Sequence, residues 1–152
     1  MSEFTVTCTL EVNIPTKPLL FKITVDDKDV FFVNTSETTY NIAFDVPEDG
    51  NDHSIKFIMA GKTDDHAETD DNNDVIDSAQ VEIKHISIAG VDITGLLMYE
   101  TSKTPSLFIE YTHDGNGYDN KVTVPFSSVM GYNGVAEFKI SSPVYLWLLD
   151  HM

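Results

Sequence analysis

The side chains with the clearest chemical potential lie in an acidic segment in the middle of the chain, "GKTDDHAETDDNNDVIDSAQVEI", residues 61–83. Between Asp64 and Asp77 this segment carries seven acidic side chains and no lysine. Because neighbouring carboxylates repel one another, the segment must either extend into solvent or bind a cation. Calcium takes roughly six to eight oxygen ligands from carboxylates, amides and carbonyls, which this segment supplies densely. The residues that would bind calcium are Asp64, Asp65, Asp70, Asn72, Asp74 and Asp77.

The ligand spacing in this segment differs from that of an EF-hand. Asp70, Asn72 and Asp74 match the first three ligand positions of an EF-hand loop. Val75, however, stands where that loop requires glycine, and Val81 stands where it requires glutamate. Two interpretations stay open: calcium coordination of another geometry in a β-sandwich loop, or a solvated acidic loop without a ligand.

A second polar loop, "HDGNGYDN" at residues 113–120, combines oxygen ligands with an aromatic ring. Asp114, Asn116 and Tyr118 would offer hydrogen-bonding groups and a stacking platform to a glycan. The same sequence is also typical of an ordinary turn in an all-β protein, because Asp, Asn and Gly favour tight turns. These three residues form the predicted glycan-binding set.

The residue types that most often perform catalysis do not form a recognisable motif. The five histidines are scattered and show no spacing typical of a zinc site. The single cysteine, Cys8, is in phase with Val6 and Leu10 and is therefore expected in the core. The chain also lacks a nucleophile-elbow serine and a glycine-rich phosphate-binding loop. We therefore expect a protein that is not an enzyme.

The charge of the chain limits the partners it can bind. The formal net charge is −16, and all nine cationic residues are lysines. Nucleic-acid binding depends on basic side chains, with arginine prominent in base recognition, so we expect no nucleic-acid partner. An anionic membrane surface would repel the chain as well. The longest apolar run, residues 144–149, is far shorter than the ~20 residues of a membrane-spanning helix.

Length and composition indicate a single domain, residues 1–152, with 41% hydrophobic residues. One cysteine cannot form a disulfide within the chain, which is typical of folding in a reducing cytoplasm. The first residues, "MSEFTVTCTL", have neither the basic region nor the apolar stretch of a signal peptide. We therefore expect synthesis in the cytoplasm without an export signal.

The hydrophobic pattern is that of β-strands along nearly the whole chain. Residues 4–14 alternate strictly between apolar even and polar odd positions, as a half-buried strand does. Similar short runs follow, separated by turns rich in Gly, Asn and Asp. A change of phase near Lys84 and His85 indicates a β-bulge. The pattern predicts eight to ten short strands, with little or no helix, in an antiparallel β-sandwich that is jelly-roll-like.

The C-terminal segment "SSPVYLWLLDHM" is the exception, because both of its alternating faces are apolar. It is either a strand covered on both sides or a strand with one side against a partner chain. A short helix that begins at Ser142 and Pro143 is the other possibility. For the partner contact, aromatic side chains are favoured anchors. The predicted interface residues are Tyr145, Trp147 and Leu149.

The segment "EDGNDHSIKFIMAGKTDD…NNDVIDSAQVEIKHISIAGVDI" resembles the core of calcium-dependent carbohydrate-binding β-sandwich modules. In that family a Gly-x-His entry leads into a strand, an acidic loop and a second strand that ends in I-x-I-x-G. The positions that correspond to this plan are Gly50, His53, Ile55, Phe57, Asp74, Val81, Ile83, Ile88 and Gly90, with two residues in place of one between Gly50 and His53. This resemblance implies calcium as a cofactor and surface glycans as partners.

A second resemblance covers about residues 52–152. "GKTDDH", "IKHISIAGVDI", "THDGNGY" and "MGYNGVAEFKISSPVYLWLLDHM" resemble small uncharacterised virion-associated proteins of contractile-tailed marine cyanophages. This resemblance implies a phage structural protein of the tail, neck or fibres, whose partners are other virion subunits or further copies of itself. Two functions are therefore expected: a non-catalytic structural or adaptor sandwich, or a calcium-dependent glycan-binding module for recognition of the host surface.

Overall fold

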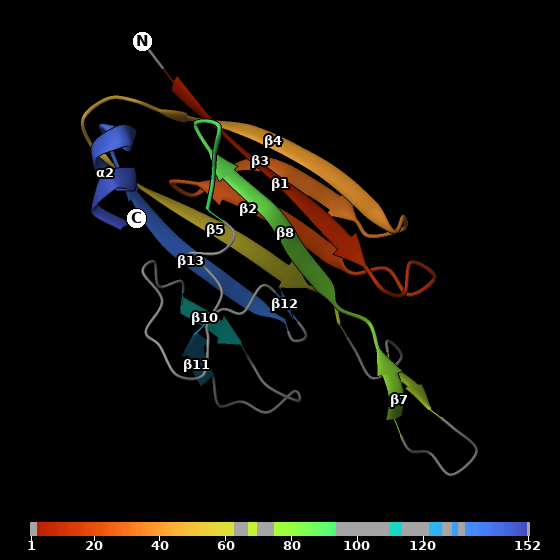
Figure 1. Ribbon diagram of the computed structural model, residues 1–152. Coiled ribbons are helices and arrows are strands. Elements are labelled where there is room, and N and C mark those ends of the chain that lie inside the picture. Colours follow the sequence, from red (N-terminus) through yellow and green to blue (C-terminus); the bar gives the residue numbers. More distant parts are fainter. Residues whose placement is uncertain are drawn as a thin grey trace.

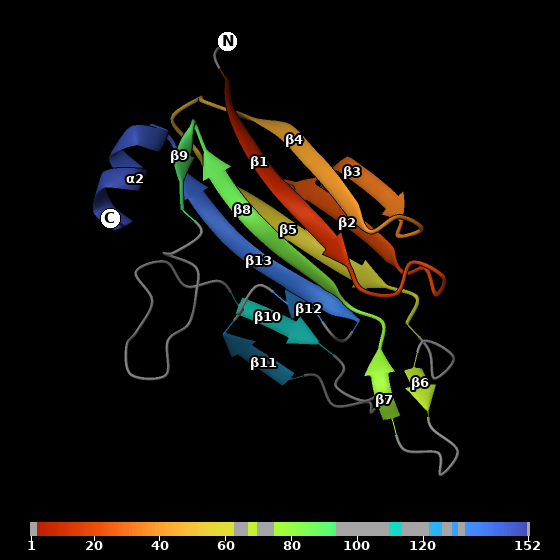
Figure 2. The same ribbon diagram turned by 45° about the vertical axis from the view of Figure 1, so that its right-hand side comes forward.

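The computed structural model describes residues 3–62, 67–69, 75–93, 110–113, 122–125, 129–130 and 133–151. These residues form two antiparallel sheets that face each other, a separate two-stranded ribbon and a short C-terminal helix (Figure 1). In both views, the helix lies at one end of the sandwich, and the two-stranded ribbon projects from the opposite end (Figures 1 and 2).

The first sheet has the strand order β12-β8-β1-β4. The short strand β9 also pairs with β8 but is not part of this order. Its strands are β1 (Glu3–Val12), β4 (Thr39–Pro47), β8 (Val81–Ile88), β9 (Val91–Asp92) and β12 (Val129–Met130). The second sheet has the order β11-β10-β13-β5-β2-β3. Its strands are β2 (Leu20–Val25), β3 (Lys28–Asn34), β5 (Asp52–Ala60), β10 (Glu110–His113), β11 (Val122–Pro125) and β13 (Gly134–Ser141). The ribbon consists of β6 (Ala67–Thr69) and β7 (Val75–Ser78).

The predicted all-β antiparallel sandwich is confirmed. The chain passes from one sheet to the other between β1 and β2, again between β3 and β4, and once more between β4 and β5. Such repeated passage between sheets is typical of a jelly-roll-like sandwich. The described residues hold thirteen strands, more than the eight to ten expected. The surplus is the ribbon and the two-residue strands β9 and β12, which are too short for hydrophobic alternation to reveal.

The core lies between the two sheets and follows the alternation of the sequence. On β1 every even position is buried, from Phe4 to Val12, and Ile42, Phe44 and Val46 of the neighbouring β4 are buried with it. The second sheet contributes Phe21 and Phe57, whose ring centroids are 6.4 Å apart in a stacked pair. Cys8 is buried among these residues, as predicted.

The predicted bulge in β8 is confirmed. Thr7 of β1 pairs with Ser87, but Thr9 pairs with Lys84, so β8 carries one extra residue at this point. His85 adopts a positive φ of 55°, in the left-handed region that residues other than glycine seldom occupy. The extra residue resets the alternation, and the apolar residues on both sides of it therefore point into the same core.

The C-terminal segment is a helix, α2 (Val144–His151), and the strand interpretation of this segment is wrong. Its buried residues are Val144, Trp147 and Leu148, at the i, i+3 and i+4 spacing of one helix face. Strand alternation would have placed Val144 and Trp147 on opposite faces. Across the described ranges, no helix has the length and apolarity that crossing a membrane requires.

Candidate functional site

The exposed face of α2 gathers three large apolar side chains. Tyr145 is 64% exposed, Leu146 is 61% exposed and Leu149 is 71% exposed. Leu149 is four positions from Tyr145 and three from Leu146, and residues three and four apart on a helix are neighbours, so these side chains form one surface. We call Tyr145, Leu146 and Leu149 the helix patch. The opposite face of α2 is buried against the sandwich, which fixes the direction in which the patch points.

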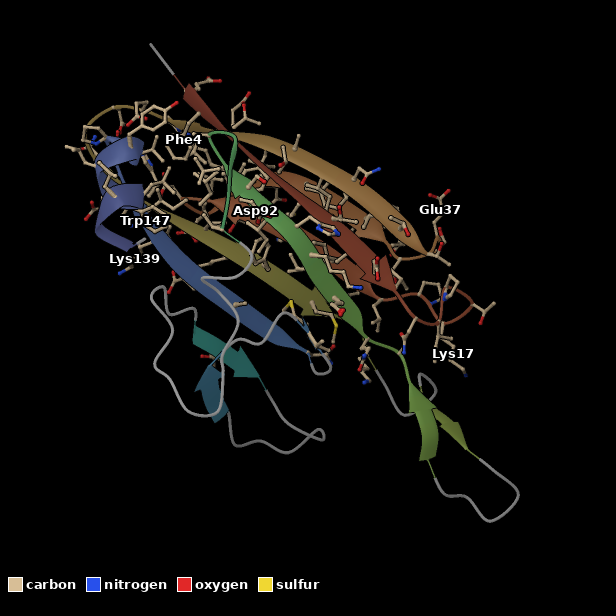
Figure 3. All side chains as sticks on the ribbon, viewed as in Figure 1. Phe4, Lys17, Glu37, Asp92, Lys139 and Trp147 are labelled. Atoms are coloured by element: carbon tan, nitrogen blue, oxygen red, sulfur yellow. The ribbon has the colours of Figure 1, made fainter. Side chains whose placement is uncertain are left out.

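Helix α2 is held by its buried face at one end of the sandwich. Trp147 is only 6% exposed and belongs to the same core cluster as the inner strands. In Figure 3, Trp147 lies at the same end of the molecule as Phe4, whereas Lys17 and Glu37 lie at the other end. Burial of a large aromatic side chain contributes strongly to stability, so Trp147 anchors the helix to the fold.

The N-terminus of α2 is capped by a carboxylate from elsewhere in the chain. Glu48 Oε1 accepts a hydrogen bond of 2.9 Å from the backbone N–H of Val144 and another from the hydroxyl of Ser142. The first N–H groups of a helix have no partner within the helix, and the helix dipole favours negative charge there. Glu48 therefore satisfies one of these donors and places its charge where the dipole stabilises it.

The turn that carries Glu48, residues 48–51 between β4 and β5, has further bonds to the start of α2. The N–H of Gly50 donates to Ser142 Oγ over 3.0 Å. The N–H of Ser142 donates to the carbonyl of Asn51 over 3.2 Å. Gly50 has a positive φ of 82°, which glycine adopts without strain. The turn and the helix start thus form one hydrogen-bonded unit, although they lie far apart in the sequence.

Behind this turn lies a histidine between two carboxylates. His53 is 5% exposed, and its Nδ1 is 2.6 Å from Asp26 Oδ2. Its Nε2 is 2.8 Å from Asp49 Oδ1. Carboxylates only accept hydrogen bonds, so both contacts are satisfied only when both ring nitrogens carry protons. The geometry therefore requires an imidazolium, held between the β2–β3 turn and the β4–β5 turn.

The electrostatics of this group agree with its geometry. Burial alone would lower the pKa of His53, but the hydrogen bonds and charges of Asp26 and Asp49 outweigh burial and raise it. Burial alone would raise the pKa of Asp26, but hydrogen bonds from His53 and from the Ser54 N–H lower it. The N–H of Asn51 and the ring of His53 lower the pKa of Asp49.

The Asp26–His53–Asp49 group is not arranged for catalysis. A general base needs a free nitrogen, and each ring nitrogen of His53 already faces a carboxylate. Cys8 is not an alternative nucleophile, because burial raises the pKa of its thiol to about 12. The arrangement of His53 and its partners instead joins two turns of the fold. Sequence reasoning missed this role, although His53 is in alternation phase with Ile55 and Phe57.

Most of the predicted calcium ligands, Asp64, Asp65, Asp70, Asn72 and Asp74, lie outside the described residues. Asp77 lies on β7, where its register partner on β6 is Glu68. The acidic segment is therefore partly a β-ribbon, whereas a loop was expected throughout. No group of three or more His, Cys, Asp or Glu side chains within the described part of the chain could hold a metal ion. Calcium binding stays a prediction.

The predicted glycan-binding residues Asp114, Asn116 and Tyr118 also lie outside the described residues. Glycan binding stays a prediction.

Of the predicted interface residues, the structure places Tyr145 and Leu149 on the exposed face of α2 and Trp147 on its buried face. The prediction grouped the three by strand alternation, and helical spacing separates Trp147 from the other two. The same reasoning missed Leu146, which is 61% exposed and which the helix brings beside Leu149, three positions along. The Ser142–Pro143 pair was the available signal, because proline favours the first positions of a helix.

A second group of exposed apolar side chains lies at the edge of the second sheet. β3 is the edge strand, and on it Phe32 is 59% exposed and Val30 is 37% exposed. The neighbouring Lys22, which pairs with Phe32, forms an ion pair with Asp29 over 3.4 Å. Charged residues on an edge strand hinder pairing with other chains. The helix patch, which is more exposed and has no charge among its three side chains, is the stronger candidate.

Comparison of the chain with protein-family models, with curated proteins and with solved structures finds no match.

Replacing Glu48 by alanine is expected to lower the free energy of unfolding by about 1–2 kcal/mol. The substitution removes the acceptor for the Val144 N–H and for the Ser142 hydroxyl. Glu48→Gln is the matched control, since it keeps a side-chain oxygen and should lose less stability. Urea unfolding of both variants measures the difference, and equal losses would contradict a capping role.

Proposed function

We propose that this protein is a non-catalytic structural or adaptor sandwich of a phage virion, which acts through protein–protein contacts made by the helix patch. The observation that carries the proposal is that Tyr145, Leu146 and Leu149, all more than half exposed, share one face of a helix whose other face is buried. Contiguous exposed apolar surface of this kind marks interaction sites on soluble proteins.

The way α2 is attached suits it to binding. A partner that meets a rigid surface loses less conformational entropy than one that must order a mobile segment. Trp147 anchors one side of α2 in the core, and Glu48 caps its start, so the patch is held in a defined orientation. Tyr145 adds an aromatic ring with a hydroxyl, a combination that is frequent in the energetically dominant residues of interfaces.

The charge of the chain favours contact through this patch over contact elsewhere. At a formal charge of −16, two copies repel each other over most of their surfaces. The helix patch consists of neutral side chains, so apolar burial can outweigh repulsion there. The virion context, in the tail, neck or fibres, rests on the resemblance of residues 52–152 to virion-associated phage proteins.

The proposal is tested most directly as self-association. We expect sedimentation velocity to show that the wild type assembles as its concentration rises. The double variant Tyr145→Lys/Leu149→Lys should remain monomeric. Burial of a large apolar side chain contributes about 1.5–3 kcal/mol, so loss of two should weaken association about a hundredfold or more. Val30→Lys/Phe32→Lys, which adds the same two positive charges at the edge of the second sheet, is the matched control and should behave like the wild type.

A wild type that remains monomeric at all concentrations would contradict self-association through the patch. Equal weakening by Val30→Lys/Phe32→Lys would show that added positive charge, and not the position of the patch, controls assembly.

A further inference from the structure

We propose that the protonation state of His53 controls how firmly α2 is held on the sandwich, so that the helix patch is fixed when His53 is charged and loosens when it is neutral. The coupling between His53 and α2 stands on the contacts described above. Only its consequence for partner binding rests on the proposed function of the patch.

The contacts between the ring of His53 and its two carboxylates depend on the protons of the ring. In the charged ring, Nδ1–H donates to Asp26 over 2.6 Å and Nε2–H donates to Asp49 over 2.8 Å. A neutral ring keeps only one N–H, and its other nitrogen then presents a lone pair to a carboxylate oxygen. Two acceptors at this distance repel each other, so one of the two carboxylates must move away.

Asp49 is the carboxylate that moves. Asp26 is held independently of His53, because its Oδ1 accepts from the Ser54 N–H over 2.9 Å. Its own N–H also donates to the carbonyl of Ser54 over 2.9 Å. Asp49, by contrast, has its other hydrogen bond with the N–H of Asn51, within the same turn. The bond to His53 is therefore what attaches the Asp49 side chain to β5.

Hydrogen bonds connect this turn to the start of the helix. Residues on both sides of Asp49 bond to the start of α2: Glu48 to Val144 and Ser142, and Gly50 to Ser142. Asn51 adds its carbonyl as an acceptor for Ser142. In this four-residue turn, the Asp49 side chain is hydrogen-bonded to His53 of β5, and the other three residues are hydrogen-bonded to the start of the helix. Movement of Asp49 away from the ring displaces the cap of α2.

Two charged groups of the described residues act on the ring of His53: Asp26 from the β2–β3 turn and Asp49 from the β4–β5 turn. Glu48, in the same turn as Asp49, is directed instead to Ser142 and Val144. On the neighbouring strand β13, the residue opposite His53 is the apolar Ile140.

The sign of the pH dependence follows from these partners. The pKa of His53 is raised above its ordinary 6.5. Its stabilising contribution is therefore complete below pH 6.5 and is lost as the pH rises through the raised pKa. The pKa values of Asp26 and Asp49 are lowered from 3.8, so their contributions are complete above pH 3.8 and are lost as the pH falls through the lowered values. Helix α2 is therefore held firmly in the pH range between the transition of Asp26 and Asp49 and the transition of His53.

The sequence supplies its own reporter for α2. Trp147 is the single tryptophan of the chain, and it is buried on the inner face of the helix. Acrylamide quenching of its fluorescence therefore measures how often α2 leaves the sandwich. We expect the quenching constant to rise about twofold or more between about pH 5.5 and about pH 9. Its midpoint should lie above 6.5, the ordinary pKa of histidine, and the far-ultraviolet circular dichroism of the strands should stay constant.

Three variants show whether His53 causes the transition. His53→Gln should abolish it, leaving quenching independent of pH over this range. Asp49→Asn removes one carboxylate charge and should move the midpoint to lower pH, which keeps the test decisive if His53→Gln does not fold. His151→Gln removes the histidine that lies on α2 itself and should leave the transition in place. A flat wild-type titration, a transition that persists in His53→Gln, or an unchanged midpoint in Asp49→Asn would overturn the proposal.

The measurement is made at a protein concentration at which the chain is monomeric. Failure of the helix patch to bind a partner would then leave the pH dependence of Trp147 quenching unchanged. Conversely, quenching of Trp147 that does not depend on pH would leave the self-association test of the patch unaffected, so the two proposals fail separately.

Discussion

Replacing Trp147 by alanine is expected to lower the free energy of unfolding by about 3–5 kcal/mol, which is a large part of the stability of a domain of this size. The indole is 6% exposed and belongs to the core cluster, so its removal leaves a cavity between α2 and the sheets. Urea unfolding, followed by the circular dichroism of the strands, measures the loss.

Tyr145→Ala is the control for this prediction, because Tyr145 lies on the same helix but is 64% exposed. A substitution of this kind on the surface usually changes stability by no more than about 0.5 kcal/mol. Similar losses in the two variants would contradict the docking of α2 through Trp147. The contrast also shows that Trp147→Ala is a poor probe of partner contacts, since it damages the fold before it changes the exposed surface.

The second large effect is expected in the chemistry of Cys8. Burial raises the pKa of its thiol from 9.0 to about 12, a difference of three pKa units and hence a thiolate fraction about a thousandfold smaller. Because the thiolate is the reactive form, alkylation of the native protein near pH 8 should be at least about a thousandfold slower than alkylation in urea. The loss of free thiol with time measures both rates.

A matched control places a thiol on the opposite face of the same strand. Thr7 is exposed next to Cys8 on β1, so Thr7→Cys in a Cys8→Ala background should react almost as fast as an unfolded thiol. Native Cys8 reacting at a rate close to that of the control would contradict its position in the core.

Much of the fold was predictable because it depends on local alternation. Phe4 to Val12 on β1 face the core as their even positions indicate, and the phase change at His85 marks the bulge that the register of β1 and β8 contains. Both signals arise from the two-residue period of a strand, in which each side chain reports its own face. The turns rich in Gly, Asn and Asp separate the strands for equally local reasons.

The candidate site was only partly predictable, because two of its determinants are not local. A short apolar run such as residues 144–149 fits a buried strand and a short helix equally well, and periodicity alone does not separate them. The cap that favours the helix comes from Glu48, which is 96 residues from Val144. The partner Asp26 is 27 residues from His53 and is one of 25 acidic residues, so no pattern in the sequence singles it out.

The order of strands within the sheets has a consequence for how the protein folds. β1 lies between β4 and β8, and β5 lies between β2 and β13, so each of these inner strands has one neighbour from a distant part of the chain. Large loops must close, at a cost in chain entropy, before these pairings contribute any favourable energy. Folding on a scale of milliseconds to seconds is typical of such topologies. During synthesis β1 leaves the ribosome well before β8 exists, so the backbone edge of β1 that pairs with β8 must stay unpaired or be shielded until the later strand arrives.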